Sequence, residues 1–121
     1  TQSLICNIGQ LTTSVHSFHE RFGLIGPSTR EELLSRIAIQ SEEVQELHQA
    51  LLHEPIANIA AEATDILYVA IGTLLRLDNG LATKAIQEVI DKNNAKTWDT
   101  HHINEAGKVT RRPLSALDRP L

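Results

Sequence analysis

The chain has 121 residues, a net charge of −4 and a pI near 5.8. That length predicts a single domain over residues 1–121, and the acidic balance argues against nonspecific binding to nucleic acid or anionic membranes. The chain is 41% hydrophobic, which is too apolar for disorder, and it has no apolar run of about 18 residues to predict a membrane span. The single cysteine, Cys6, excludes an internal disulfide framework and a cysteine zinc cluster. We expect a cytoplasmic protein with no nucleic-acid or membrane partner.

The first predicted helix covers roughly residues 2–22. Its apolar residues recur at three- and four-residue spacings, which is typical of an amphipathic helix: Leu4, Ile8, Leu11, Val15, Phe18 and Phe22. Gly23 follows where a left-handed C-terminal residue is expected, and Gly26-Pro27 then interrupts the backbone.

The second predicted helix begins with Ser28-Thr29-Arg30-Glu31, which fits a capping box, and continues to about Leu52. Its apolar stripe is predicted to contain Leu33, Ile37, Val44, Leu47 and Leu51. Pro55 suits the first turn of a third helix, whose predicted inner stripe contains Ile59, Ile66, Val69 and Thr73.

Asp78-Asn79-Gly80 is interpreted as a stop signal. A fourth helix is predicted over about residues 81–96, with Ala82, Ala85, Ile86, Val89 and Ile90 facing inward. The helical periodicity ends after Trp98, where Asn104-Glu105-Ala106-Gly107 fits either a hairpin turn or an irregular tail. The predicted fold is all-α, a bundle of about four helices. Its long exposed stripes predict a homodimer or homotetramer.

The positions of the acidic residues are the most informative feature. Glu43 and Glu46 are three residues apart on the second helix, and Glu62 and Asp65 are three apart on the third, so each pair shares a helix face. Ile59 and Ile66 flank Glu62 at helical spacing, which places the second pair within an apolar stripe. The break near Pro55 lies between the pairs, so they would face each other across an antiparallel hairpin.

Ionised carboxylates on a packed face are destabilising unless they are compensated. The basic residues nearby, Arg36 and Arg76, are too few for this purpose. Hard divalent cations that prefer oxygen ligands would solve the problem, with Mg²⁺ the first choice and Mn²⁺ an alternative. Glu42 adds a fifth carboxylate beside Glu43. The competing interpretation is that the acids form an ordinary solvated face.

At these residues the chain resembles the MazG-like, all-α nucleoside triphosphate pyrophosphohydrolases, which share a superfamily with phosphoribosyl-ATP pyrophosphohydrolase. The family's EExxE and ExxD motifs correspond to Glu42-Glu43-Val44-Gln45-Glu46 and Glu62-Ala63-Thr64-Asp65. The resemblance extends over about residues 15–113 and includes four further segments: Phe18-His19-Glu20-Arg21-Phe22-Gly23, Asp65-Ile66-Leu67-Tyr68, Asn93-Asn94-Ala95-Lys96 and Gly107-Lys108-Val109.

The resemblance implies hydrolysis of a nucleoside triphosphate between its α and β phosphates, to monophosphate and pyrophosphate, in nucleotide-pool housecleaning. It implies that Mg²⁺ is held by Glu43, Glu46, Glu62 and Asp65. Asn93 and Lys96 would contact phosphate or sugar, and His19 and Phe22 would lie near the nucleotide. Glu42 is the candidate for taking the proton of the attacking water, with Glu43 and Glu46 as alternatives.

Two other functions stay open. The first is an enzyme of the same superfamily that acts on phosphoribosyl-ATP. The second is a non-catalytic helical oligomerisation module. His16 and His19, and the pair His101-His102, lack a third ligand at metal-binding spacing and are interpreted as surface or partly packed residues. Trp98 could stack on a base, although packing is the commoner role for tryptophan. No P-loop and no nucleophilic triad is present.

Overall fold

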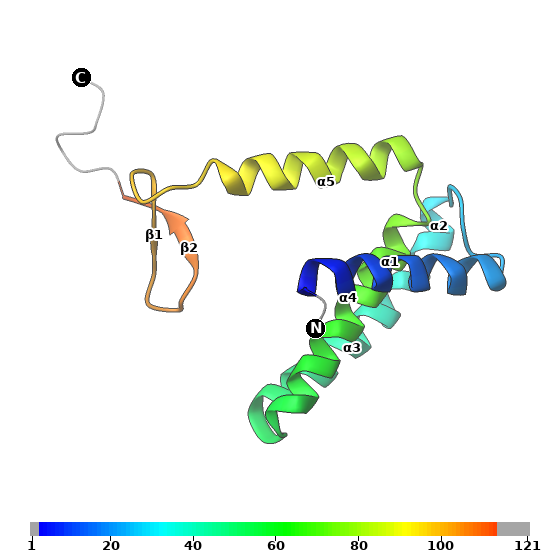
Figure 1. Cartoon of the computed structure of the whole chain (residues 1–121), viewed down its shortest axis with the longest axis horizontal. Helices are drawn as coiled ribbons and strands as arrows, with labels where there is room; N and C mark the ends of the chain where they lie inside the picture. The colour runs from blue at the N-terminus through cyan, green and yellow to red at the C-terminus, as the bar shows by residue number, and fades with distance from the viewer. Residues whose placement is uncertain (1–2, 114–121) are drawn as a thin grey trace. The chain divides into compact units, whose positions relative to one another are not determined.

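A computed structural model describes residues 3–113, which divide into two compact units, one ending at Ala82 and the other beginning at Thr83. Figure 1 shows the elements in chain order. They are α1 (Leu4–Arg21), α2 (Arg30–Leu33), α3 (Ser35–His53), α4 (Ile56–Leu74), α5 (Asn79–Asn94), β1 (His101–Ile103) and β2 (Val109–Arg111). The all-α prediction is confirmed, and the hairpin version of the tail is the one that forms. The single domain over residues 1–121 stays a prediction.

In the first unit, α3 and α4 form an antiparallel pair joined by a tight link at Glu54 and Pro55, and α1 packs on α4 (Figure 1). The buried apolar residues in the described chain are Val15, Ala50 and Ala82. This core is small for a chain of this length, because most of the large aliphatic side chains keep a substantial exposed fraction.

The face that α3 turns toward α4 differs from the predicted stripe. The covered or half-covered positions from α2 through α3 are Leu33, Arg36, Gln40, Glu43, Leu47 and Ala50. Ile37, Val44 and Leu51 are 63%, 49% and 60% exposed, so the prediction was wrong for these three. Two sets of residues on this segment have helical spacing: the covered set, and the set that contains Ile37, Val44 and Leu51. The sequence prediction favoured the second set because it is more apolar, but that set faces outward.

The start of the second predicted helix is one residue later than expected. The capping box is formed by Thr29, whose Oγ1 accepts from the Glu32 backbone N–H at 3.1 Å, while Glu32 Oε1 accepts from the Thr29 N–H at 3.2 Å. Ser28 instead donates its backbone N–H to Arg76 O at 2.9 Å. Both registers match the capping-box pattern, because glutamates stand at 31 and 32. A turn at Leu34 then divides the predicted helix into α2 and α3.

Asp78-Asn79-Gly80 begins a helix instead of ending one, which corrects the predicted stop. α4 has already ended at Leu74, and Asp78 Oδ2 accepts from the Leu81 backbone N–H at 3.1 Å in the first turn of α5. Aspartate is favoured both in turns and at helix N-termini, so the sequence pattern fits either role. Of the side chains predicted to face inward on α5, Ala82 is buried, while Ala85, Ile86, Val89 and Ile90 are exposed.

The second unit contains most of α5 and the β1–β2 hairpin. The strands pair antiparallel, with His101 opposite Arg111, His102 opposite Thr110 and Ile103 opposite Val109. Asn104 organises the turn, since its Oδ1 accepts from the backbone N–H groups of Ala106 and Lys108, each at 3.0 Å. Gly107 takes a φ of +80°, a conformation that glycine adopts without strain.

In the part of the chain that the structure describes, we find no helix with both the length and the apolar character that a membrane crossing requires.

Candidate metal centre

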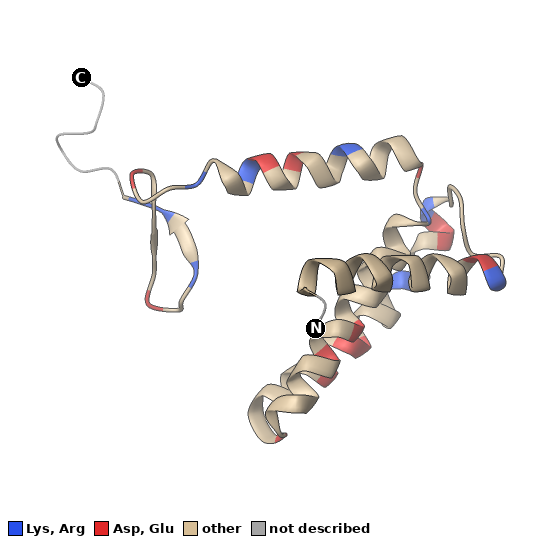
Figure 2. Ribbon diagram, in the orientation of Figure 1, with Lys and Arg blue, Asp and Glu red and all other residues tan. Residues whose placement is uncertain are grey.

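Four carboxylates from two neighbouring helices converge in the first unit. Glu43 and Glu46 come from α3 and Glu62 and Asp65 from α4, and one oxygen of each lies within 4.8 Å of the others. Figure 2 shows acidic segments of α3 and α4 meeting partway along the helix pair. The i, i+3 spacing gives each pair a common face, and the antiparallel arrangement brings the two faces together.

Burial divides the four side chains into two inner and two outer carboxylates. Glu43 and Glu62 are half-buried on the packed faces of α3 and α4, whereas Glu46 and Asp65 are exposed. The Oε2 atoms of Glu43 and Glu62 are buried and have no hydrogen-bond partner among the described residues. An unpartnered buried carboxylate oxygen is strongly destabilising. The site therefore contains two oxygens whose partner is missing.

Their environment makes the two inner carboxylates harder to ionise. Burial is the main cause that raises the pKa of Glu43, and the nearby charges of Glu46 and Asp65 add to it. Burial also raises the pKa of Glu62, again with contributions from Glu46 and Asp65. Both effects penalise negative charge at this position. A bound cation would favour the ionised carboxylates and would therefore lower both pKa values.

The basic residues nearby are engaged elsewhere. Arg36 donates from Nε to Thr73 Oγ1 at 3.0 Å and from Nη2 to Val69 O at 2.7 Å. Arg76 pairs with Glu32, at 3.7 Å. The donor set of the cluster consists of carboxylate oxygens, which are the ligands that Mg²⁺, Mn²⁺ and Ca²⁺ prefer. The cluster could therefore hold a divalent metal ion, and its two orphaned oxygens fit that occupant.

Two further residues lie next to the cluster. Glu42 is exposed on α3 beside Glu43. Gln40, which our sequence reasoning missed, lies one turn before Glu43 on the same half-buried face, and its Nε2 has no hydrogen-bond partner among the described residues. The signal was available in the sequence, because Gln40 is at i−3 from Glu43 and so shares its face.

His19 and Phe22, the candidates for the nucleotide's surroundings, occupy different environments on and after α1. His19 is 3% exposed. Its Nδ1 lies 2.9 Å from Leu24 O, and because a carbonyl only accepts, Nδ1 carries the proton. Phe22 is 60% exposed and packs on Phe18, which in turn meets Tyr68 of α4 edge-on. The role of both residues in substrate binding stays a prediction.

The close packing around His19 depends on Gly72 of α4. A Cβ at Gly72 would lie 2.5 Å from His19 Nε2 and 2.7 Å from Arg36 Nη2. Both neighbours are held by hydrogen bonds and cannot easily move aside. We therefore expect Gly72→Ala to lower the free energy of unfolding by about 1–3 kcal/mol, the usual effect of overpacking, as measured by urea denaturation.

Gly9→Ala in α1 is the matched control for this prediction. Gly9 is also helical, but a Cβ there would meet nothing within 4 Å. That substitution should raise the free energy of unfolding by roughly 0.5–1 kcal/mol, because alanine loses less backbone entropy on folding. Equal effects of the two substitutions would contradict the packing around His19.

Asn93 and Lys96, the candidates for phosphate or sugar contacts, lie together in the second unit. Lys96 Nζ donates to Asn93 Oδ1 at 3.1 Å, and Asn93 Nδ2 donates to Val89 O at 2.9 Å. The two side chains therefore form one polar group at the end of α5. Their function as substrate ligands stays a prediction.

Most of the chain matches one known protein family. The family model described as phosphoribosyl-ATP pyrophosphohydrolase matches residues 17–94, a range that contains all four carboxylates of the cluster. No curated protein and no solved structure gave a significant match. Because the match covers well over half of the sequence, the chain belongs to the phosphoribosyl-ATP pyrophosphohydrolase family.

Proposed function

We propose that this protein is a Mg²⁺-dependent nucleotide pyrophosphohydrolase that cleaves a nucleoside or deoxynucleoside triphosphate between its α and β phosphates. The observation that carries the proposal is the four-carboxylate cluster, with its two buried and unpartnered oxygens, inside a matched pyrophosphohydrolase domain. The products would be a nucleoside monophosphate and pyrophosphate, which suits the removal of unwanted nucleotides from the cytoplasmic pool.

Glu43, Glu46, Glu62 and Asp65 would hold the metal. When bound, a divalent cation there would neutralise phosphate charge and make a water molecule more acidic. The chain supplies the remaining chemistry. Glu42 is exposed beside the cluster and would accept the proton of the attacking water, with Glu43 and Glu46 as the alternative bases. Asn93 and Lys96 would orient the phosphates or sugar, and His19 and Phe22 would shape the nucleotide's surroundings.

A second candidate substrate is phosphoribosyl-ATP. The description of the matching family model favours it. It requires the same bond cleavage and the same carboxylates, so the site chemistry does not separate the two substrates. A non-catalytic helical module is less well supported, because fully solvated acids would not leave two carboxylate oxygens buried without partners.

Pyrophosphate release from a panel of NTPs, dNTPs and phosphoribosyl-ATP tests the proposal. We expect release with Mg²⁺, release with Mn²⁺, and none with chelator. Turnover of phosphoribosyl-ATP alone would favour the second candidate. No release from any of these substrates with either metal would contradict a catalytic function and favour the non-catalytic module.

We also propose that the protein is a homodimer or homotetramer. The outer stripe of α3 exposes Ile37, Val44 and Leu51, which are seven residues apart as in a heptad repeat. A stripe of this kind is typical of a helix that packs on another helix. It is a large apolar surface for a chain with only a small core of its own.

We expect sedimentation equilibrium to give at least twice the mass of one chain. Val44→Glu should shift the protein toward monomer, because it places a charge in the middle of the stripe. Ser17→Glu, at an exposed position of α1, is a control that adds the same charge elsewhere. A monomeric parent protein, or equal masses for both variants, would contradict this interface.

A further inference from the structure

The charges of the two units are opposite in sign. Residues 3–82 contain four Lys and Arg against ten Asp and Glu, whereas residues 83–113 contain six Lys and Arg against four Asp and Glu. The acidic excess of the first unit includes the four carboxylates of the proposed metal centre. The basic excess of the second unit lies in an otherwise acidic chain, and it requires a separate explanation.

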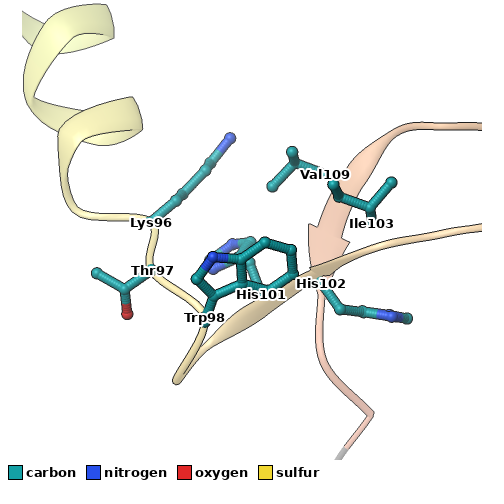
Figure 3. A pocket seen from close by; sticks show the side chains of 7 residues that line it. All are labelled: Lys96, Thr97, Trp98, His101, His102, Ile103 and Val109. Atoms are coloured by element: carbon teal, nitrogen blue, oxygen red, sulfur yellow. The ribbon is translucent and has the colours of Figure 1, made fainter.

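The hairpin register divides one face of the second unit into an apolar part and a cationic part. His101 pairs with Arg111 and Ile103 pairs with Val109. Residues two apart on a strand point to the same side, so the two pairs share a face. Figure 3 shows Ile103 and Val109 beside each other.

Two adjoining hollows occupy this region. The apolar hollow, of about 260 Å³, is lined by the apolar side chains of Trp98, Ile103 and Val109 together with Lys96, Thr97, His101 and His102 (Figure 3). The cationic hollow, of about 360 Å³, is lined by Lys92, Lys96, His101 and Arg111. Lys96 and His101 line both hollows. Each is near the lower end of the roughly 300–1,000 Å³ typical of small-molecule sites, so each suits one part of a nucleotide.

The cations of this region are not neutralised within the described chain. In residues 3–113, no carboxylate lies within ion-pair distance of Lys92, Lys96 or Arg111. Burial lowers the pKa of His101, and the neighbouring charges of Lys96 and Arg111 contribute to that shift. Like charges held this close repel each other, and a polyanion would relieve the repulsion.

We propose that this face of the second unit binds the nucleotide substrate, with the base on Trp98, Ile103 and Val109 and the phosphates on Lys92, Lys96, His101 and Arg111. The inference rests on the proposed function and extends it from Asn93 and Lys96 to an aromatic platform and a cationic cluster. An exposed indole suits a base, because stacking on an aromatic ring accepts any base. Trp98 is 69% exposed.

Trp98 also provides the measurement, because it is the single tryptophan of the chain. Its fluorescence can be followed in the full-length protein with chelator present, when no turnover occurs. We expect ATP and the four dNTPs to quench the emission saturably. Adenosine and inorganic tripolyphosphate each present one half of the ligand, so each should bind about tenfold more weakly than ATP or worse.

Arg111→Gln and Arg112→Gln form a matched pair that removes the same charge from neighbouring residues. Arg111 lines the cationic hollow and Arg112 does not. Both are exposed, so both variants should fold, which circular dichroism checks. We expect Arg111→Gln to weaken ATP quenching and raise KM about tenfold with little change in kcat, since it removes a charge-assisted contact. Arg112→Gln should change neither quantity by more than about twofold.

The outcomes separate the inference from the proposed function. Pyrophosphate release without quenching, and with equal KM values for the two arginine variants, would overturn the inference while the proposed function stands. Saturable quenching that Arg111→Gln weakens, without pyrophosphate release, would support the nucleotide site and overturn the proposed function. Tighter binding of a single-stranded oligonucleotide than of any mononucleotide would overturn the inference in favour of a nucleic-acid surface.

Discussion

Replacing Glu62 by glutamine should abolish metal-dependent pyrophosphate release while leaving the helices folded. Glutamine has the shape of glutamate, so the packing between Ile59 and Ile66 on α4 is preserved. It removes one of the two inner carboxylates of the cluster and with it a strong ligand for a divalent cation. Because a catalytic metal contributes several kcal/mol to transition-state stabilisation, we expect kcat/KM to fall about 10³-fold or more.

Glu88→Gln is the control for this experiment. Glu88 is an exposed glutamate on α5 that pairs only weakly with Lys84, at 4.0 Å, and it is not part of the cluster. Glu88→Gln should leave kcat/KM within about twofold of the parent value, because an exposed ion pair contributes little. If Glu62→Gln retained most of the parent activity, the carboxylate cluster would not be where the reaction takes place, and another set of residues would have to be sought.

The carboxylate cluster was predictable from the sequence because its geometry is local. The i, i+3 spacing of Glu62 and Asp65 and the flanking Ile59 and Ile66 place the pair on a packed face of any helix that forms there. A single break near Pro55 leaves the antiparallel hairpin as the simplest way to continue the chain. The convergence of the four acids therefore depends on one turn and not on the whole fold.

The face of α3 was less predictable, because burial there does not follow hydrophobicity. Arg36 takes an inner position through its hydrogen bonds to Val69 O and Thr73 Oγ1, and Val44 is left outside. A choice based on apolar character alone selects the outer stripe, which is the surface we assign to a second copy of the chain. The sequence of one chain does not distinguish an internal contact from an intermolecular one.

The predicted helix start at Ser28 and the predicted helix end at Asp78 were also wrong because one sequence pattern fits two structures. Thr29 and Ser28 both satisfy the capping-box pattern, and Asp78 suits a helix start as well as a turn. The face of the second unit that we propose for the nucleotide was only partly predictable, because the sequence pointed to Asn93, Lys96 and Trp98 but not to their grouping with the hairpin residues. It depends on the register that puts His101 opposite Arg111, and a shift of one residue would have placed these side chains on opposite sides.

The metal-free protein should be stabilised when Glu43 and Glu62 are both replaced by glutamine. Burial raises the pKa of both carboxyls, so the native state binds their protons more tightly than the unfolded chain does. The stability that these groups contribute is present below the ordinary carboxyl pKa of about 4.5 and is lost as the pH rises through the raised native values. At pH 7.5 the parent protein therefore carries a penalty that the double variant lacks.

Thermal melts of the two proteins in chelator, from pH 7.5 down to the ordinary carboxyl pKa of about 4.5, measure this penalty directly. The variant should melt at a higher temperature than the parent at pH 7.5, and the difference should shrink as the pH falls toward 4.5. The six histidines and the other titrating groups are common to both proteins, so their effects cancel in the difference. Parallel curves for the two proteins would contradict the burial of these carboxyls.

Adding Mg²⁺ should reverse the order of the two melting temperatures. A ligand that binds only the native state at one hundred times its Kd stabilises it by about 2.7 kcal/mol, which corresponds to roughly 10 °C for a chain of this size. The parent should gain this stabilisation at pH 7.5 and lose it toward pH 5, where protons compete for the carboxylates. The double variant should gain little at any pH. An increase of the same size in both proteins would mean that Mg²⁺ binds elsewhere, because the two chains differ only at Glu43 and Glu62, whose Oε2 atoms have no hydrogen-bond partner among the described residues.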